Sequence, residues 1–188
     1  FNPGLFASST FLTEVLVAAL GETLIPRGAH VLDMGTGSGV GAVFAATLAG
    51  RVDAVDVNPE AVRCARLNVL LHRVEDRVTV WEGDLFAPLA GRRYDVVLFN
   101  PPFYRGVPRD VLDRAWRSVD VVERFAAGLD AHLRPGGRAF VVLSTDGDAA
   151  RFLAAFALHG FVRDVVATRR RINETLTLYR LTPRRSVP

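Results

Sequence analysis

The chain has 188 residues, of which 49% are hydrophobic and 23% are charged, which is ordinary for one soluble globular domain with a full core. All 23 basic residues are arginine, which excludes a catalytic lysine, and a net charge of +3 is too small to imply a nucleic-acid partner by itself. The single cysteine, Cys64, excludes an internal disulfide, and no apolar run reaches the ~18 residues of a membrane span, so we expect a cytoplasmic protein with no membrane partner.

The first residues show no apolar periodicity, and Ser8–Thr10 can cap a helix that extends to about residue 20. Apolar, strand-like runs then alternate with helical patterns. We expect strands at residues 31–34, 52–57, 78–81, 94–99, 138–143, 161–168 and 175–181. We expect further helices at residues 39–49, 59–72, 119–133 and 148–158. Asn58 is the expected N-cap of the second of these, with Pro59 at its first position.

This order of elements predicts the fold class. Strands that alternate with helices, and that are apolar on both faces, form parallel sheets covered by helices on both sides. The last two strands are joined by a short connector and predict a hairpin, hence an antiparallel edge strand. The expected fold is therefore α/β, a Rossmann-like doubly wound sheet of seven strands. We expect one domain overall, in which an N-terminal segment and helix at residues 1–28 pack on a core formed by residues 29–188.

The most informative stretch is Val31–Gly39, where glycines at alternate positions follow an apolar strand and precede a helix. Glycines let a ligand approach the backbone without meeting a Cβ, and the free N–H groups of a helix start would face that ligand. Such turns bind several nucleotide-like cofactors. A dinucleotide-binding oxidoreductase would carry G-x-G-x-x-G, a pattern that the alternate glycines at positions 35, 37, 39 and 41 do not meet.

Polar residues also lie at or directly after the ends of four predicted strands. They are Asp33, Asp56, Asp84 and Asn100. In open α/β sheets, ligands bind beyond the carboxyl ends of the parallel strands. We therefore expect these four side chains to meet at one edge of the sheet, although they are far apart in the sequence.

With these motifs the chain resembles the class I S-adenosylmethionine-dependent methyltransferases. The matching motifs are Asp33–Gly39 for the family's D-x-G-x-G-x-G turn, Asp56 for the acid ending the second strand, Gly83–Leu85 for the acid after the third, Asn100–Phe103 for N-P-P-[FY], and Leu133–Gly137 for the turn before the fifth. The match covers roughly residues 29–182, and the resemblance implies that residues 29–188 form the catalytic domain. Within the family the chain most resembles the protein-(glutamine-N5) and small-RNA methyltransferase group.

The resemblance implies that S-adenosyl-L-methionine is the cofactor. The residues it places at the cofactor are Asp33, Gly35, Thr36, Gly37, Gly39, Asp56, Val57, Asp84, Leu85 and Asn100. Asp56 would accept both ribose hydroxyls and Asp84 the adenine amino group, whereas Asp33 would orient the cofactor's amino-acid end or only tie the turn together. The four histidines do not have the spacing of metal ligands, so we expect no metal.

The resemblance also implies the catalytic residues Asn100, Pro101 and Phe103. Relatives with this motif methylate a planar nitrogen, either a glutamine amide or the exocyclic amino group of a nucleobase. Asn100 Oδ1 and the Pro101 carbonyl would accept its two N–H groups, and Phe103 can stack on its plane.

The acceptor stays open among a protein, an RNA and a small molecule. The Arg105–Arg117 connector follows the N-P-P-F motif and can contact a phosphate or an acidic surface, and Trp116 can form part of a substrate wall. A cofactor-binding domain without turnover is the non-enzymatic alternative.

Overall fold

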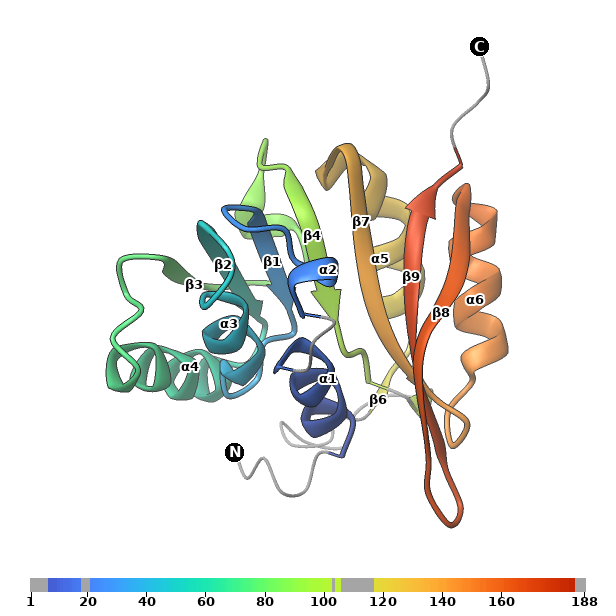
Figure 1. Ribbon diagram of the computed structural model, residues 1–188. Coiled ribbons are helices and arrows are strands. Elements are labelled where there is room, and N and C mark those ends of the chain that lie inside the picture. Colours follow the sequence, from blue (N-terminus) through green and yellow to red (C-terminus); the bar gives the residue numbers. More distant parts are fainter. Residues whose placement is uncertain (1–6, 18–20, 103, 106–116, 185–188) are drawn as a thin grey trace.

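The protein is built around a seven-stranded sheet with helices on both faces (Figure 1). A computed structural model describes residues 7–17, 21–102, 104–105 and 117–184. The strands of the sheet follow the order β3-β2-β1-β4-β7-β9-β8. Their bounds are β1 His30–Met34, β2 Arg51–Asp56, β3 Val78–Glu82, β4 Tyr94–Phe99, β7 Leu133–Ser144, β8 Phe161–Arg170 and β9 Thr175–Pro183. Two short strands, β5 Tyr104–Arg105 and β6 Arg117–Ser118, pair separately.

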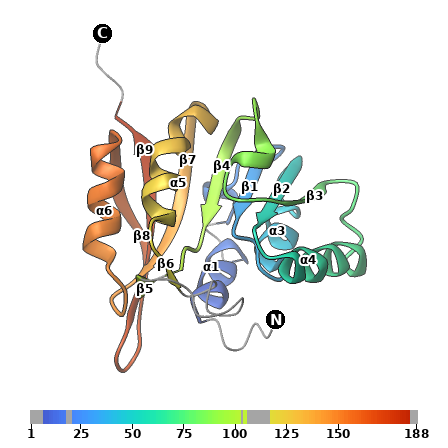
Figure 2. The same ribbon diagram turned by 180° about the vertical axis from the view of Figure 1, so that it is seen from behind.

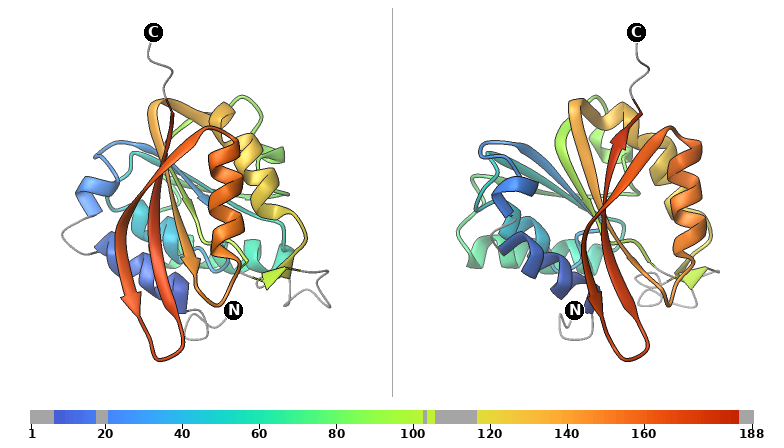
Figure 3. Two further views of the ribbon diagram at one scale, coloured as in Figure 1. Left: turned by 90° about the vertical axis from the view of Figure 1, so that its right-hand side faces the viewer. Right: turned by 45° about the vertical axis from the view of Figure 1, so that its right-hand side comes forward.

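Five strands, β3, β2, β1, β4 and β7, are mutually parallel, whereas β9 is antiparallel to both β7 and β8. The predicted seven-stranded α/β sheet, parallel apart from an antiparallel hairpin at one edge, is therefore confirmed. The last strand inserts between β7 and β8, so that β8 forms the edge itself. Figure 3 shows the hairpin of β8 and β9 extending beyond the rest of the sheet.

Helices follow the strands in the predicted alternation. They are α1 Ala7–Val17, α2 Gly21–Leu24, α3 Val40–Ala45, α4 Pro59–Leu71, α5 Val121–Leu129 and α6 Ala149–Leu158, with 3-10 turns at Ala87–Leu89 and Asp130–His132. The predicted start of α4 is confirmed, because Asn58 Oδ1 accepts from the Glu60 N–H at 3.0 Å and Pro59 opens the helix. In the described part of the chain, no helix is long and apolar enough to cross a membrane.

Two helices end before their predicted ends because the backbone tightens into 3-10 bonding. Directly after α3, the N–H groups of Thr47 and Leu48 donate to carbonyls three residues back, and the Thr47 hydroxyl donates to the Phe44 carbonyl at 2.7 Å. The helix therefore stops at Ala45 instead of about residue 49. The helix predicted at 119–133 likewise ends early, because it becomes a 3-10 turn from Asp130. It also starts two residues later than predicted, at residue 121.

Strand β7 begins earlier than predicted. We expected a turn and then a strand from residue 138, yet the strand starts at Leu133 and its pairing with β4 shifts register near Tyr94. Gly137 allows this, because a Cβ there would lie 2.8 Å from the backbone oxygen of Tyr94 and 2.9 Å from that of Arg134. The Pro-Gly-Gly segment is thus an irregularity within the strand and not a loop before it.

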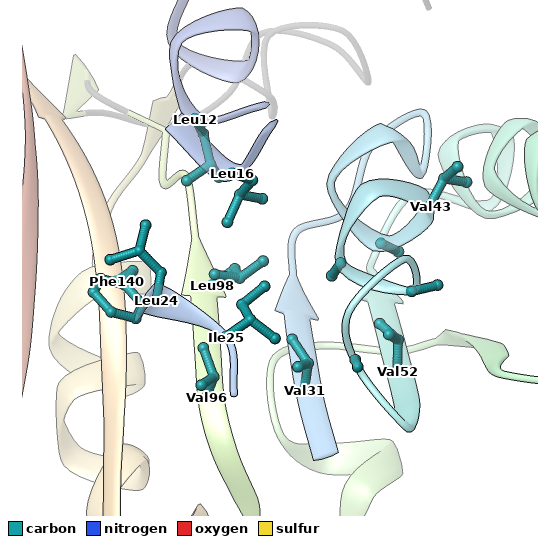
Figure 4. Close-up of a cluster of buried hydrophobic side chains, with 14 of the residues drawn as sticks. Leu12, Leu16, Leu24, Ile25, Val31, Val43, Val52, Val96, Leu98 and Phe140 are labelled. Atoms are coloured by element: carbon teal, nitrogen blue, oxygen red, sulfur yellow. The ribbon is translucent and has the colours of Figure 1, made fainter. Parts of the chain in front are cut away.

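The core has two layers because successive residues of a strand point to opposite faces. Val31 of β1 and Leu98 of β4 belong to a buried cluster shared with α1, α2 and α3, part of which is drawn in Figure 4. Leu32 and Phe99, their neighbours in sequence, belong to the second cluster, which α5 and α6 cover (Figure 2). The predicted site residues Asp33, Asp56, Asp84 and Asn100 lie at or directly after the carboxyl ends of the parallel strands, between these two layers.

Candidate functional site

The glycine-rich turn between β1 and α3 is fastened to the end of β2. The Thr36 N–H donates to the Val55 carbonyl at 2.9 Å, and the Gly37 N–H donates to Asp56 Oδ2 at 2.9 Å. Gly35 and Gly37 have φ of +65° and +57°, a conformation that residues with a Cβ rarely adopt. At Gly35 and Gly37 the turn therefore presents backbone without a side chain at the carboxyl edge of the sheet.

The carboxylate of Asp33 points into this turn. It is 5% exposed, accepts from the Thr36 hydroxyl at 2.5 Å and bonds to the backbone of Ala42 in α3. Gly41 makes room for it, since a Cβ there would lie 3.0 Å from Asp33 Oδ2. Burial raises the pKa of Asp33 to about 6, against the opposing effect of these hydrogen bonds. This geometry favours the turn-tying role, and a contact of Asp33 with the cofactor stays a prediction.

Asp56 ends β2 and faces the turn. Its Oδ1 accepts from the Asn58 N–H and its Oδ2 from the Gly37 N–H, each at 2.9 Å, and the backbone of Val57 is a third partner. Burial raises the pKa of Asp56, while these amides counteract that rise. A carboxylate has about four acceptor positions, so three amides leave room for a ribose hydroxyl. The residues present at this strand end therefore fit the predicted ribose site.

Asp84 follows β3 and is held by a residue that the sequence did not indicate. Arg124 of α5 donates from Nη1 to Asp84 Oδ2 at 2.6 Å and from Nη2 to Oδ1 at 3.3 Å. The same guanidinium donates from Nε to Asp120 at 3.2 Å. The Asp84 carboxylate is half exposed and its orientation is fixed, as the predicted adenine site needs.

Leu85, directly after Asp84, has a φ of +50°. Among the described residues, one other non-glycine residue has a positive φ, Arg73, which follows the C-terminus of α4, where such a conformation is common. Leu85 follows no helix, and residues held in such a conformation cluster at functional sites. The predicted placing of Leu85 at the cofactor is consistent with this conformation and stays a prediction.

Asn100 follows β4 and has a half-satisfied amide. Its Nδ2 donates to the hydroxyls of Ser8 and Ser9 in α1, each at 3.0 Å. Its Oδ1 is buried and accepts no hydrogen bond within the described part of the chain. The sequence indicates Ser8 and Ser9 as helix caps in a segment that in relatives often closes over the cofactor, and nothing local indicates their contact with a residue more than 90 positions away.

Gly39 lies in the turn but packs on α4. A Cβ at Gly39 would lie 2.9 Å from both the Cα and the Cβ of Ala65. Close packing of the turn on α4 therefore accounts for glycine at this position. A contact between Gly39 and the cofactor stays a prediction.

The structure brings the four strand ends together as expected. The Gly83 N–H donates to the backbone oxygen of Asp56 at 3.0 Å, which joins the ends of β2 and β3. Met34, at the end of β1, is paired with Phe99 of β4, which precedes Asn100. Figure 1 shows α1 at this same end of the sheet, toward which β1 and β4 point.

Some expectations lie outside the described residues. They concern Phe103, Trp116 and residues 106–116 of the Arg105–Arg117 connector. Within the ranges that are described, no group of three or more histidine, cysteine or acidic side chains could hold a metal ion.

Comparison with known proteins identifies the family. The family model of the methyltransferase small domain matches residues 2–169. The ribosomal protein uL3 glutamine methyltransferase of Bradyrhizobium diazoefficiens is 39% identical over 57% of this chain and 38% of its own length. The release factor glutamine methyltransferase of Moorella thermoacetica is 34% identical over 76% of this chain and 56% of its own. The chain thus spans about half the length of these two relatives.

The fold is shared with solved methyltransferases. The ribosomal protein L11 methylase of Lactobacillus delbrueckii subsp. bulgaricus superposes with a TM-score of 0.67 at 20% identity, over 90% of this chain and 76% of its own. The resemblance to class I S-adenosylmethionine-dependent methyltransferases is confirmed by the family match over most of the chain. The chain therefore belongs to the methyltransferase small domain family.

Proposed function

We propose that this chain is the catalytic part of an N-methyltransferase that moves a methyl group from S-adenosylmethionine to a planar nitrogen, with a glutamine side-chain amide as the acceptor. The observation that carries the proposal is Asn100 Oδ1, a buried acceptor without a partner among the described residues. A buried polar atom left without a partner costs free energy, and native structures keep few of them. An N–H of the acceptor amide would satisfy it.

The chemistry needs such an acceptor atom. The nitrogen of an amide delocalises its lone pair into the carbonyl and is a poor nucleophile. Hydrogen bonds from its N–H groups to Asn100 Oδ1 and the Pro101 carbonyl would hold the lone pair toward the methyl group and stabilise the positive charge that develops on nitrogen. These two groups come from one stiff loop, since Pro101 and Pro102 follow Asn100 directly.

The methyl donor supplies a methyl group on a sulfonium, so that a C–S bond breaks as the N–C bond forms and a neutral thioether leaves. The extra proton on nitrogen passes to solvent after attack, so the chain needs to provide no general base. Its work is to bind and orient. Asp56 and the backbone of the glycine-rich turn would hold the ribose and the amino-acid end, and Asp84 with Leu85 would hold the adenine.

A glutamine amide is favoured over a nucleobase by two observations. Two relatives named above, at 39% and 34% identity, are glutamine methyltransferases of a ribosomal protein and of a release factor. In addition, several arginines are paired with carboxylates, among them Arg124, Arg169 and Arg180. Nucleic-acid binding relies on basic side chains that are free to neutralise phosphates.

The test uses methyl-labelled S-adenosylmethionine with separate pools of ribosomal proteins and release factors, of RNA, and of metabolites. We expect label on a glutamine of a protein in the first pool, located by mass spectrometry of its peptides. Label confined to RNA or metabolites would overturn the choice of acceptor. Failure of the protein to bind S-adenosylmethionine in calorimetry would overturn the whole proposal, whereas binding without transfer of label to any pool would favour a cofactor-binding domain without turnover.

Two further expectations belong to the same proposal. Residues 1–28 would act as an N-terminal segment and helix on the catalytic domain formed by residues 29–188. This is supported by α1, whose Phe11, Leu12, Val15 and Leu16 are buried in the first core cluster. A cytoplasmic location is supported by the single cysteine, Cys64, which is unpaired.

A further inference from the structure

We propose that Ser8 and Ser9 are positioning residues, which hold the amide of Asn100 in the one orientation that presents Oδ1 to the acceptor nitrogen. This inference rests on the proposed function and extends it to the N-terminal helix, to which the sequence assigns no catalytic part. It concerns three side chains that lie in two elements far apart in the chain.

The contact geometry is complete on one side of the amide. Nδ2 carries two N–H groups, and the hydroxyl oxygens of Ser8 and Ser9 each lie 3.0 Å from it. Ser8 is 5% exposed, so water does not readily replace it. Both donors of the amide are therefore used on the α1 side, and the other side presents a bare acceptor, Oδ1.

The alternative orientation is a half-turn of the amide about its bond to Cβ. A serine hydroxyl can donate as well as accept, so the serines would still bond the amide after the turn. The two orientations differ on the side of the amide that faces away from α1. That side would then carry two buried N–H groups, and these would face the N–H groups of the acceptor. The observed orientation leaves one acceptor unfilled, whereas the turned one leaves two donors unfilled and repels the substrate.

Helix α1 is held firmly enough to serve this role. Figure 4 shows Leu12 and Leu16 of α1 packed over the end of β4 beside Leu98. From the other side, Arg169 of β8 forms an ion pair with Glu14 and lies 5.1 Å from the ring of Phe11. The serine hydroxyls are thus fixed relative to β4, and with them the plane of the Asn100 amide.

The test compares the wild-type protein with the double variant Ser8→Ala/Ser9→Ala, using the glutamine acceptor that the labelling experiment identifies. Without the hydroxyls, the Nδ2 donors of Asn100 lose their partners, and the amide no longer prefers the orientation that presents Oδ1 to the acceptor. We expect kcat to fall roughly tenfold to a hundredfold, the effect of losing hydrogen bonds to one buried group. The affinity for S-adenosylmethionine, measured by calorimetry, should stay close to that of the wild type.

Three comparisons separate positioning from a merely structural role. Ser8→Thr/Ser9→Thr keeps both hydroxyls and should restore most of kcat. Thr13→Ala is the matched control, because it removes a hydroxyl one turn further along α1 that donates to the Ser9 carbonyl at 2.8 Å and not to Asn100. It should leave kcat unchanged. In the Asn100→Ala background, the two serine substitutions should cause no further loss.

Each outcome decides the proposal. An unchanged kcat in Ser8→Ala/Ser9→Ala overturns it, and so does a parallel loss of kcat and cofactor affinity, which would mean that α1 only supports the fold. If the double variant does not fold, the single variants Ser8→Ala and Ser9→Ala are measured, and each should lose part of kcat. A wild-type protein that transfers no methyl group refutes the proposed function first and this inference with it.

Discussion

Arg124 forms a hydrogen-bonded ion pair with Asp84 at the carboxyl edge of the sheet, although 40 positions separate them in the sequence. The two hydrogen bonds, at 2.6 and 3.3 Å, fix the plane of the carboxylate, and Asp120 holds the guanidinium from its other side at 3.2 Å. The hydrogen bond to Asp84 raises the pKa of Arg124, so the guanidinium keeps its charge. Both side chains are about half exposed, so the pair contributes little to stability and more to orienting Asp84.

The first prediction is that Arg124→Gln weakens binding of S-adenosylmethionine by roughly two- to fivefold, the range expected for one exposed ion pair. The freed carboxylate of Asp84 would spend part of its time turned away from the adenine amino group. Calorimetry measures the affinity, and the melting temperature should barely change. Arg63→Gln is the control, since Arg63 pairs with Glu60 at 3.3 Å on the surface of α4. Equal affinities in all three proteins would contradict the role given to Arg124.

The second prediction concerns Asp56. Asp56→Ala removes the acceptor of the Gly37 and Asn58 amides together with the proposed acceptor of the ribose hydroxyls. The affinity for S-adenosylmethionine should fall by roughly tenfold to a hundredfold, as for a lost hydrogen bond to a charged group. Asp164→Ala is the control, because it breaks an exposed pair with Arg180 in the β8–β9 hairpin. An Asp56→Ala variant that binds like the wild type would show that the carboxylate serves the turn alone.

The third prediction separates binding from transfer. Asn100→Ala should lower kcat by roughly 10²–10³-fold, the cost found when one group that stabilises a transition state is removed. The cofactor affinity should hardly change, because the proposed adenosine contacts lie on the ends of other strands. Labelled methyl transfer and calorimetry on the same preparation give the two quantities. A matched fall of both would mean that Asn100 supports the structure of the loop instead of the acceptor.

The parts of the fold that the sequence predicted depend on local chemistry. The Asn58 and Pro59 start of α4 and the alternation of apolar strands with helices are set by residues close together in the chain. The start of β7 was missed because Gly137 folds against the Tyr94 carbonyl of another strand. No local pattern carries that information.

In the site, too, local features were predicted from the sequence and contacts between distant residues were not. The strand ends with Asp33, Asp56, Asp84 and Asn100 were predicted, since parallel strands carry their carboxyl ends to one edge. The residues that orient those side chains were not. Arg124 reaches Asp84 from a helix on the second core layer, and hydroxyls of α1 reach Asn100. A single sequence shows such partners only as a surface arginine and as helix caps.

The fourth prediction follows from the buried carboxyl group of Asp33. Burial raises its pKa from 3.8 to about 6, so the folded state binds the proton more tightly than the unfolded chain. Above pH 6 the ionised carboxylate therefore lowers the free energy of unfolding, and this destabilisation disappears as the pH falls toward 4. Asp33→Asn removes it, and the stability of the variant relative to the wild type should rise between pH 4 and pH 7 by up to about 3 kcal/mol.

Urea unfolding at a series of pH values measures this difference. Thr36→Val provides the complementary variant. The Thr36 hydroxyl bonds Asp33 Oδ2 at 2.5 Å and holds the pKa down, so its loss should move the pH-dependent region to higher pH. A stability difference between Asp33→Asn and the wild type that does not vary with pH would refute the explanation.

A second buried carboxylate, Asp53 in β2, behaves in the opposite way. It is 1% exposed and accepts from Trp81 Nε1 at 2.9 Å, from the Tyr94 hydroxyl at 3.0 Å and from His30 Nε2 at 3.1 Å. Burial alone would raise the pKa of Asp53. The hydrogen bonds from His30, Trp81 and Tyr94, with the charge of Arg92 at 3.4 Å, outweigh burial and lower it. The charged form therefore stabilises the fold.

The last prediction is that Asp53→Asn destabilises the protein by about 3 kcal/mol near pH 7, because the amide turns an N–H toward donors that needed a carboxylate. The wild type loses the contribution of its carboxylate as the pH falls through the lowered pKa, so the gap between the two proteins should close in acid. Asp76→Asn, which alters an exposed pair with Arg77 at 3.6 Å, is the control in urea unfolding. Equal destabilisation by both substitutions would show that the buried network does not hold β2 in place.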